Sequence, residues 1–182
     1  MVGRRWHERG RRRLRAVVTA VRVLRHLFAP SARHSFPEDA LQRITAAIDD
    51  SELRHRGEIC FAVEAALPVR AVLAGLDARA RAEEVFAQLR LWDTEANSGV
   101  LIYLLLADHR IELVADRGLA AHIEDAQWQG VCRQIEDGLR AGQPEAAVRR
   151  GIDGVTALLV RHLPRIEGVA DANELPNRPH VL

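Results

Sequence analysis

Four oxygen-bearing side chains surround a long apolar run and have the chemistry of ligands for a divalent cation. Asp93 and Asn97 precede the run GVLIYLLLA, residues 99–107, and Asp116 and Asp125 follow it. Carboxylate and amide oxygens suit a hard cation such as calcium or magnesium. If the run and the residues after it form adjacent strands, Asp116 returns to the loop that holds Asp93 and Asn97. The four side chains therefore predict a calcium or magnesium site at one edge of a sheet.

Each of these residues also has an ordinary structural interpretation. Asp93 and Asn97 are typical of loops, where their side chains hydrogen-bond to nearby backbone groups. Asp125 is a suitable N-cap for the helix that follows it. Arg117 could pair with Asp116 and take the position of the cation. The sequence leaves both interpretations open.

Another acidic residue, Asp108, is predicted to belong to a turn. It follows the apolar run and precedes RIELVAD, residues 110–116, which together predict a hairpin. If residue 107 pairs with residue 111, residue 116 lies opposite residue 102, and the two aspartates are about 20 Å apart. Asp108 and Asp116 therefore cannot share one metal ion, and we expect Asp108 to act as a turn residue.

Nucleophilic chemistry finds little support in the sequence. Cys60 and Cys132 lie inside apolar patterns, which predicts buried free thiols in a reducing compartment. Ser98 has no Gly-x-Ser-x-Gly sequence around it. The chain has neither a His-Glu-x-x-His motif nor a glycine-rich phosphate loop. These patterns favour a protein without a nucleophilic active site.

The hydrophobic periodicity predicts elements in the order α-β-α-β-β-α-α, and these elements would position the candidate ligands. A continuously apolar strand over residues 100–107 is typical of a central strand covered on both faces. A right-handed crossover from a strand over 58–67 would make these two strands parallel. A strand over 110–116 would return antiparallel. We therefore predict a three-layer α/β/α sandwich with a small mixed sheet, plus an N-terminal amphipathic helix.

The predicted helices of the domain cover this sheet. Ser35 with Glu38 resembles a capping box for the first helix. Asp77 is a suitable N-cap for a helix over 78–91. Apolar side chains at helical spacing predict that each helix buries one face. Two further helices are predicted over 126–141 and 144–163.

Charge is distributed unevenly along the 182 residues. Residues 1–28 contain nine arginines and one glutamate, a charge of +8, whereas the remainder contains 17 arginines and 24 acidic residues, a charge of −7. This difference divides the chain into parts. We predict a basic helical arm and hinge over 1–35, an α/β domain over 36–164 and an extended, proline-containing tail over 165–182.

The arm contains a predicted amphipathic helix over residues 11–28, which Pro30 ends. Its apolar face consists of Leu14, Val17, Val18, Val21, Leu24 and Phe28. Such a helix could pack on its own domain or on a partner protein, lie on an anionic membrane surface, or contact nucleic-acid phosphates. Because no series of stacking aromatic residues accompanies the arginines, nucleic acid is the least favoured of these partners.

The location of the protein follows from what the sequence lacks. No segment reaches the roughly 20 apolar residues that a membrane-spanning helix needs. The apolar run after the arginine cluster is interrupted by Arg22 and Arg25 and has no clear cleavage site for a signal peptidase. We therefore expect a cytoplasmic protein, with peripheral attachment at the inner membrane as the alternative.

Three consecutive stretches carry a family resemblance. They are EDALQRITAAIDDSE, then GEICFAVEAAL, then ARAEEVFAQLRLWDTEANSGVLIYLLLADHRIELVADRGL. Over roughly residues 36–164 the chain resembles the TPM domain family, which includes thylakoid-lumen phosphatase-like and photosystem-repair proteins. It looks most like short bacterial members without a signal peptide or membrane helix, and the ending NELPNRPHVL is similar to their tails.

The resemblance implies a TPM-type α/β sandwich but not one activity. Some members are acid phosphatases, some bind calcium, and others act by binding during assembly or repair of membrane complexes. Many members have a Gly-x-Gly-x-Glu run after the hairpin. Here the matching residues 116–120 keep one glycine, and Ala120 replaces the acidic residue. We therefore expect a non-enzymatic module that binds a protein partner, with a divalent-metal-dependent phosphatase as the alternative.

Overall fold

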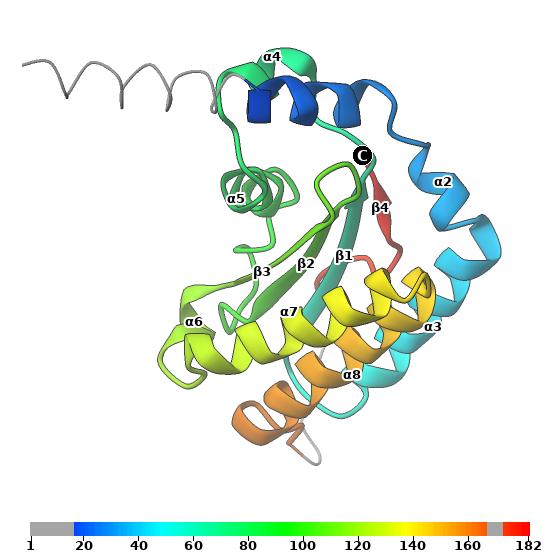
Figure 1. Ribbon diagram of the computed structural model, residues 1–182. Helices are drawn as coiled ribbons and strands as arrows, with labels where there is room; N and C mark the ends of the chain where they lie inside the picture. The colour runs from blue at the N-terminus through cyan, green and yellow to red at the C-terminus, as the bar shows by residue number, and fades with distance from the viewer. Residues whose placement is uncertain (1–16, 167–172) are drawn as a thin grey trace, which may run out of the picture.

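Four strands form one mixed sheet in this computed structural model, which describes residues 17–166 and 173–182 (Figure 1). The strand order is β3-β2-β1-β4. The two central strands are buried along their whole length, so helices must cover both faces of the sheet. The strands are β1 (Glu58–Glu64), β2 (Gly99–Leu105), β3 (Arg110–Ala115) and β4 (His180–Val181).

Strand pairing confirms the predicted directions and corrects the register of the hairpin. β1 and β2 are parallel, with Glu58 opposite Gly99, and β2 and β3 are antiparallel. Leu105 pairs with Arg110, so the turn contains four residues and is longer than predicted. Asp116 consequently lies beside Gly99, whose carbonyl accepts the Asp116 N–H at 2.9 Å, and not opposite Ile102.

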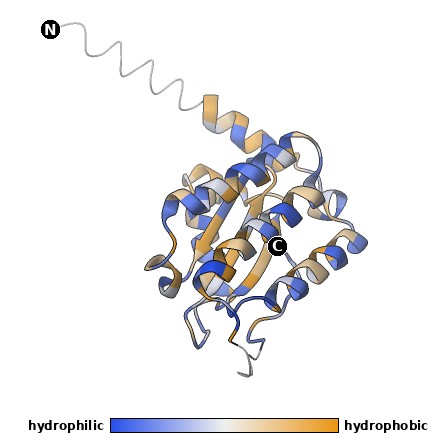
Figure 2. Cartoon of the chain, turned by 90° about the horizontal axis from the view of Figure 1, so that it is seen from below, coloured by the Kyte–Doolittle hydropathy of each residue, from blue (hydrophilic) through white to orange (hydrophobic). Residues whose placement is uncertain are grey.

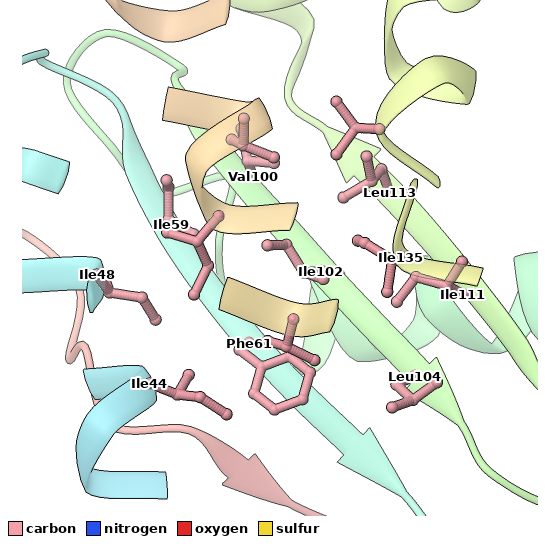
Figure 3. Packing of buried hydrophobic residues seen from close by; sticks show 14 of the residues in the cluster. Ile44, Ile48, Ile59, Phe61, Val100, Ile102, Leu104, Ile111, Leu113 and Ile135 are labelled. Atoms are coloured by element: carbon pink, nitrogen blue, oxygen red, sulfur yellow. The ribbon is translucent and has the colours of Figure 1, made fainter. Parts of the chain in front are cut away.

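The helices cover the sheet in two layers, which confirms the predicted α/β/α sandwich. α3 (Glu38–Glu52), α7 (Asp125–Arg140) and α8 (Pro144–His162) pack on one face against the larger apolar cluster. α4 (Val69–Leu73) and α5 (Ala78–Gln88) pack on the other face. Alternate residues of β1 and β2 enter the two clusters because successive side chains of a strand point to opposite faces. Figure 3 shows part of the larger cluster, with Ile44, Ile48, Ile59, Phe61, Val100, Ile102, Leu104, Ile111, Leu113 and Ile135 labelled.

The predicted helix caps are right at one position and wrong at two. The Asp77 side chain accepts the N–H of Ala80 at 2.8 Å, which confirms the cap of α5. Ser35 does not cap α3, because it ends an additional short helix, α2 (Ala32–Ser35), within the predicted hinge. Asp125 is the first residue of α7, and Glu124 is its N-cap in a capping box with Gln127.

The C-terminal residues contribute a short strand that the sequence does not reveal. His180 and Val181 pair in parallel with Ala62 and Val63 of β1, and the N–H of Leu182 donates to the Val63 carbonyl at 2.9 Å. Two residues are too few for a periodic pattern, so only the neighbouring strand identifies β4. No helix within residues 17–166 and 173–182 is both long and apolar enough to cross a membrane.

Candidate functional site

The N-terminal helix, helical over described residues 17–27, is held on the domain by polar bonds. Arg22 forms a forked ion pair with Asp108, in which Nη2 and Oδ2 are 2.7 Å apart and Nε and Oδ2 are 3.0 Å apart. Arg22 Nη2 also donates to the carbonyl of Leu76 at 2.7 Å. One arginine therefore connects the helix to both the hairpin turn and the segment before α5.

His26 completes this anchor. Its side chain is fully buried, and its Nδ1 accepts the N–H of Leu67 at 2.9 Å. Because Nδ1 accepts a hydrogen bond, Nε2 carries the proton and donates to Asp108 Oδ1 at 3.1 Å. Burial of the Asp108 carboxyl opposes its ionisation, but the hydrogen bonds from Arg22 and His26 and the charge of Arg22 hold the pKa of Asp108 below its ordinary value. Asp108 thus lies in the predicted turn and also binds the N-terminal helix.

The same helix exposes its predicted apolar face. Val18 is 60% exposed and Phe28 is 80% exposed, and Val17, Val21 and Leu24 are exposed as well. Figure 2 shows apolar segments along this helix. Only Val23, outside the predicted face, packs against the cluster of the α4 and α5 layer. Leu14 and the rest of residues 11–16 of the predicted helix lie outside the described residues. The helix therefore rests on its own domain mainly through polar contacts and leaves its apolar face unpaired within the described chain.

The structure brings two of the four predicted metal ligands together. Arg117 Nε donates to Asn97 Oδ1 at 3.1 Å, and the Arg117 backbone N–H donates to Asp116 Oδ1 at 2.7 Å. Asp116 Oδ2 is buried and has no hydrogen-bond partner in the described chain. Arg117 therefore connects the two residues, but its guanidinium contacts the amide oxygen and not the carboxylate.

The other two predicted ligands occupy the loop before β2 and the start of α7. Asp93 is exposed, and its N–H donates to the carbonyl of Arg90 at 2.9 Å. Asp125 lies in the first turn of α7. Within residues 17–166 and 173–182, no three His, Cys, Asp or Glu side chains are grouped closely enough to hold a metal ion. The four-residue cation site stays a prediction.

Gly118 lies after the hairpin at a position where the backbone leaves no room for a side chain. A Cβ atom at this position would lie 2.5 Å from the Asn97 carbonyl oxygen and 2.6 Å from the Ala96 carbonyl oxygen. The Gly118 N–H donates to the same Asn97 oxygen at 3.1 Å. Glycine therefore allows α6 (Arg117–Ala120) to approach the 92–98 loop directly.

Sequence reasoning missed a buried polar network beneath α5. The Tyr103 hydroxyl donates to Glu64 Oε2 at 2.7 Å, and Arg81 Nε donates to the same oxygen at 2.8 Å. Burial and the hydrogen bond to Glu64 raise the pKa of the Tyr103 phenol, so it stays protonated. The three residues lie in three different elements, so only an unexpected glutamate at a buried strand position could have signalled the network.

A pocket with several acidic residues lies where the C-terminal residues meet α3 and β1. Its volume is about 220 Å³, and Asp49, Glu52, Glu58 and Asn177 line it. Glu52 accepts the Ile59 N–H at 3.2 Å and the Asn177 amide at 2.7 Å. Burial, opposed by the Ile59 hydrogen bond and reinforced by the Glu58 charge, raises the pKa of Glu52 to about 7.

This pKa predicts how stability changes with pH. Between pH 4.5 and about 7 the unfolded chain loses the Glu52 proton while the folded chain keeps it, so stability falls as the pH rises through this range. Glu52→Gln should remove that loss. From pH 5 to pH 8 its free energy of unfolding should therefore rise by about 1–2 kcal/mol relative to that of the native chain, after allowance for partial exposure. Urea unfolding at several pH values measures the difference. If the free energies of unfolding of Glu52→Gln and the native chain differ by the same amount at every pH, the prediction is contradicted.

Comparison with known proteins supports the fold and the resemblance. A family model described as TPM domain matches residues 32–158. The chain is similar to the NMR structure of the BA42 protein from the psychrophilic bacterium Bizionia argentinensis. The TM-score is 0.69 and the identity 26%, over 78% of this chain and 92% of that one.

A second solved structure supports the fold alone. It is the N-terminal domain of a protein from P. gingivalis, with a TM-score of 0.55 and 13% identity, over 72% of this chain and 83% of that one. No curated protein matches the chain.

Proposed function

This chain belongs to the TPM domain family, as its sequence predicted, and we propose that it is a non-enzymatic binding module attached to an anionic membrane surface. Its N-terminal helix would make the attachment, and its α/β domain would bind a protein partner. The observation that carries the proposal is the orientation of the helix, which bonds to the domain through Arg22 and His26 while Val18, Leu24 and Phe28 face outward.

The exposed face has the chemistry of an interfacial helix. Burying one valine, leucine or phenylalanine side chain at the acyl boundary contributes about 1.5–3 kcal/mol. Residues 1–28 carry a charge of +8 from nine arginines and one glutamate. Each arginine near an anionic surface contributes about 1 kcal/mol more. These two contributions together favour reversible peripheral attachment, as expected for amphipathic helices with a basic face.

The proposed location is the cytoplasmic face of the inner membrane, because that leaflet presents anionic lipids to a basic segment. Docking of the helix by a polar anchor keeps the α/β domain next to the surface. The proposed role of that domain is recognition of a second protein, in keeping with the family members that act by binding.

Vesicle flotation tests the attachment. The doubly substituted Leu24→Glu, Phe28→Glu chain should bind vesicles containing phosphatidylglycerol at least about tenfold less than the native chain, because both apolar side chains are lost from the acyl boundary. Leu53→Glu with Leu73→Glu is a matched control, since these side chains are also exposed, at 67% and 64%, and lie outside the helix. Equal flotation of the native and Leu24→Glu, Phe28→Glu chains would exclude the helix face as the attachment site.

A second candidate function is a divalent-metal-dependent phosphatase of the acid-phosphatase type. It is favoured by the buried, unpartnered Oδ2 of Asp116 beside Asn97. A calcium or magnesium ion there, with Asp93 and Asp125 as further ligands after loop movement, would polarise phosphoryl oxygens and lower the pKa of a bound water.

A metal titration followed by amide NMR tests this candidate. Saturable shifts at Asn97, Ser98, Gly118 and Asp125 in the native chain, abolished by Asp116→Asn, would support a cation site. Asp137→Asn is the control, because Asp137 is exposed and pairs with Arg140 on α7. Absence of shifts, together with no release of phosphate from an aryl phosphate in the presence of either metal, would remove the candidate.

A further inference from the structure

We infer that a groove at the end of the N-terminal helix binds the anion of a single long-chain fatty acid. The groove has a volume of about 620 Å³. The residues after the helix and α2 form one side of it, and the tip of the β2–β3 hairpin and the turn between α7 and α8 form the other. This inference goes beyond membrane attachment, because it concerns one soluble amphiphile in a defined groove.

The interior of the groove is apolar. Hydrocarbon surface comes from four separate segments of the chain, through Phe28, Leu106, Leu139 and Pro144. Volumes of roughly 300–1,000 Å³ with mostly apolar walls are typical of sites for small ligands. A straight hydrocarbon chain suits such a surface because it needs no hydrogen-bond partners along its length.

The polar side chains of the groove are all able to bind an anion. Arg25, His34 and His109 line it, and none of the lining residues in the described chain is acidic. Asp108, next to His109, is compensated by its ion pair with Arg22 and its hydrogen bond from His26. Arginine and histidine donors bind a carboxylate by charge-assisted hydrogen bonds. Apolar walls combined with basic groups match an amphiphile that carries one negative head.

The same features disfavour other ligands. A peptide would bring backbone N–H and C=O groups against walls that offer few partners. A nucleotide would require several polar contacts for its base and sugar. A cationic amphiphile would meet Arg25 without a nearby uncompensated carboxylate. The basic side chains of the groove therefore favour an anionic head group, and its apolar walls favour a hydrocarbon chain.

Titration of the full chain with dodecanoate, below its micelle-forming concentration and without vesicles, tests the inference. Amide NMR should show saturable shifts at Leu106, Ala107, His109 and Gly142. Dodecyltrimethylammonium has the same chain with the opposite charge and should bind at least about tenfold more weakly. If these amides do not shift, or if the two amphiphiles bind equally well, the inference is overturned.

Two substitutions separate this site from the membrane surface. Arg25→Glu, at an exposed position, should weaken dodecanoate binding about tenfold, whereas Arg161→Glu on α8, outside the groove, should not. Ala29→Trp should block binding by filling the groove, and Ala146→Trp on α8 is its control. Native affinity in both Arg25→Glu and Ala29→Trp would overturn the site. Because no vesicle is present, this result does not depend on whether the helix attaches to membranes.

Discussion

Glu64→Ala should lower the free energy of unfolding by about 3–5 kcal/mol, the cost expected when one partner of a buried ion pair is removed. Glu64 is 6% exposed, and its Oε2 accepts from the Tyr103 hydroxyl at 2.7 Å and from Arg81 Nε at 2.8 Å. The substitution leaves the buried Tyr103 phenol without its acceptor and leaves the Arg81 guanidinium paired with the exposed Glu84. Urea unfolding at neutral pH measures the loss.

The neighbouring glutamate provides the control for this result. Glu84 also pairs with Arg81, at 3.1 Å, but its side chain is 50% exposed. Glu84→Ala should change the free energy of unfolding by no more than about 1 kcal/mol, because exposed ion pairs contribute little. Equal effects of Glu64→Ala and Glu84→Ala would contradict the importance of the buried network. If Glu64→Ala does not fold, Tyr103→Phe still tests the network. It should lower the free energy of unfolding by about 1 kcal/mol.

Asp108→Ala should release the N-terminal helix while the α/β domain stays folded. Arg22 and His26 would both lose their carboxylate, and His26 would keep a buried N–H with no acceptor. We expect the docking of the helix to weaken by about 2–3 kcal/mol, because Asp108 is only partly exposed. Amide hydrogen exchange measures the docking of the helix separately, because the helix and the central strands unfold locally with different free energies.

The expected pattern of exchange is specific to the helix. Amides of residues 22–27 should lose protection in Asp108→Ala, whereas those of β1 and β2 should keep theirs. Asp137→Ala removes the exposed ion pair with Arg140 on α7 and should leave both sets unchanged. Unchanged protection of the helix in Asp108→Ala would show that apolar contacts such as Val23, and not the polar anchor, hold it on the domain.

Local patterns of the sequence were sufficient for three of the four strands and for the layers that cover them, but not for β4 or the register of the hairpin. The unbroken apolar run of β2 predicted a central strand with both faces covered, and the crossover rule predicted its parallel pairing with β1. Asp77 was recognised as a cap because its partner, Ala80, is three residues away. The resemblance to the TPM family rested on these same segments, so it identified the fold for the same reason.

Tertiary structure alone decided how the polar groups are used. Arg22 and Asp108 are 86 residues apart in the chain, and Glu64 and Tyr103 are 39 residues apart. No periodic pattern links residues at such separations, because periodicity reports which face an element buries and not what its polar side chains contact.

The N-terminal helix shows this division clearly. Its sequence determined that it has an apolar face and a polar face, and it left open which of them would meet the domain. The structure places the polar face inward, because one aspartate in the hairpin turn and one backbone N–H at Leu67 satisfy Arg22 and His26 together. Bonds to partners so distant in the chain leave no local pattern in the sequence, which is why the outward direction of the apolar face could not be derived from it.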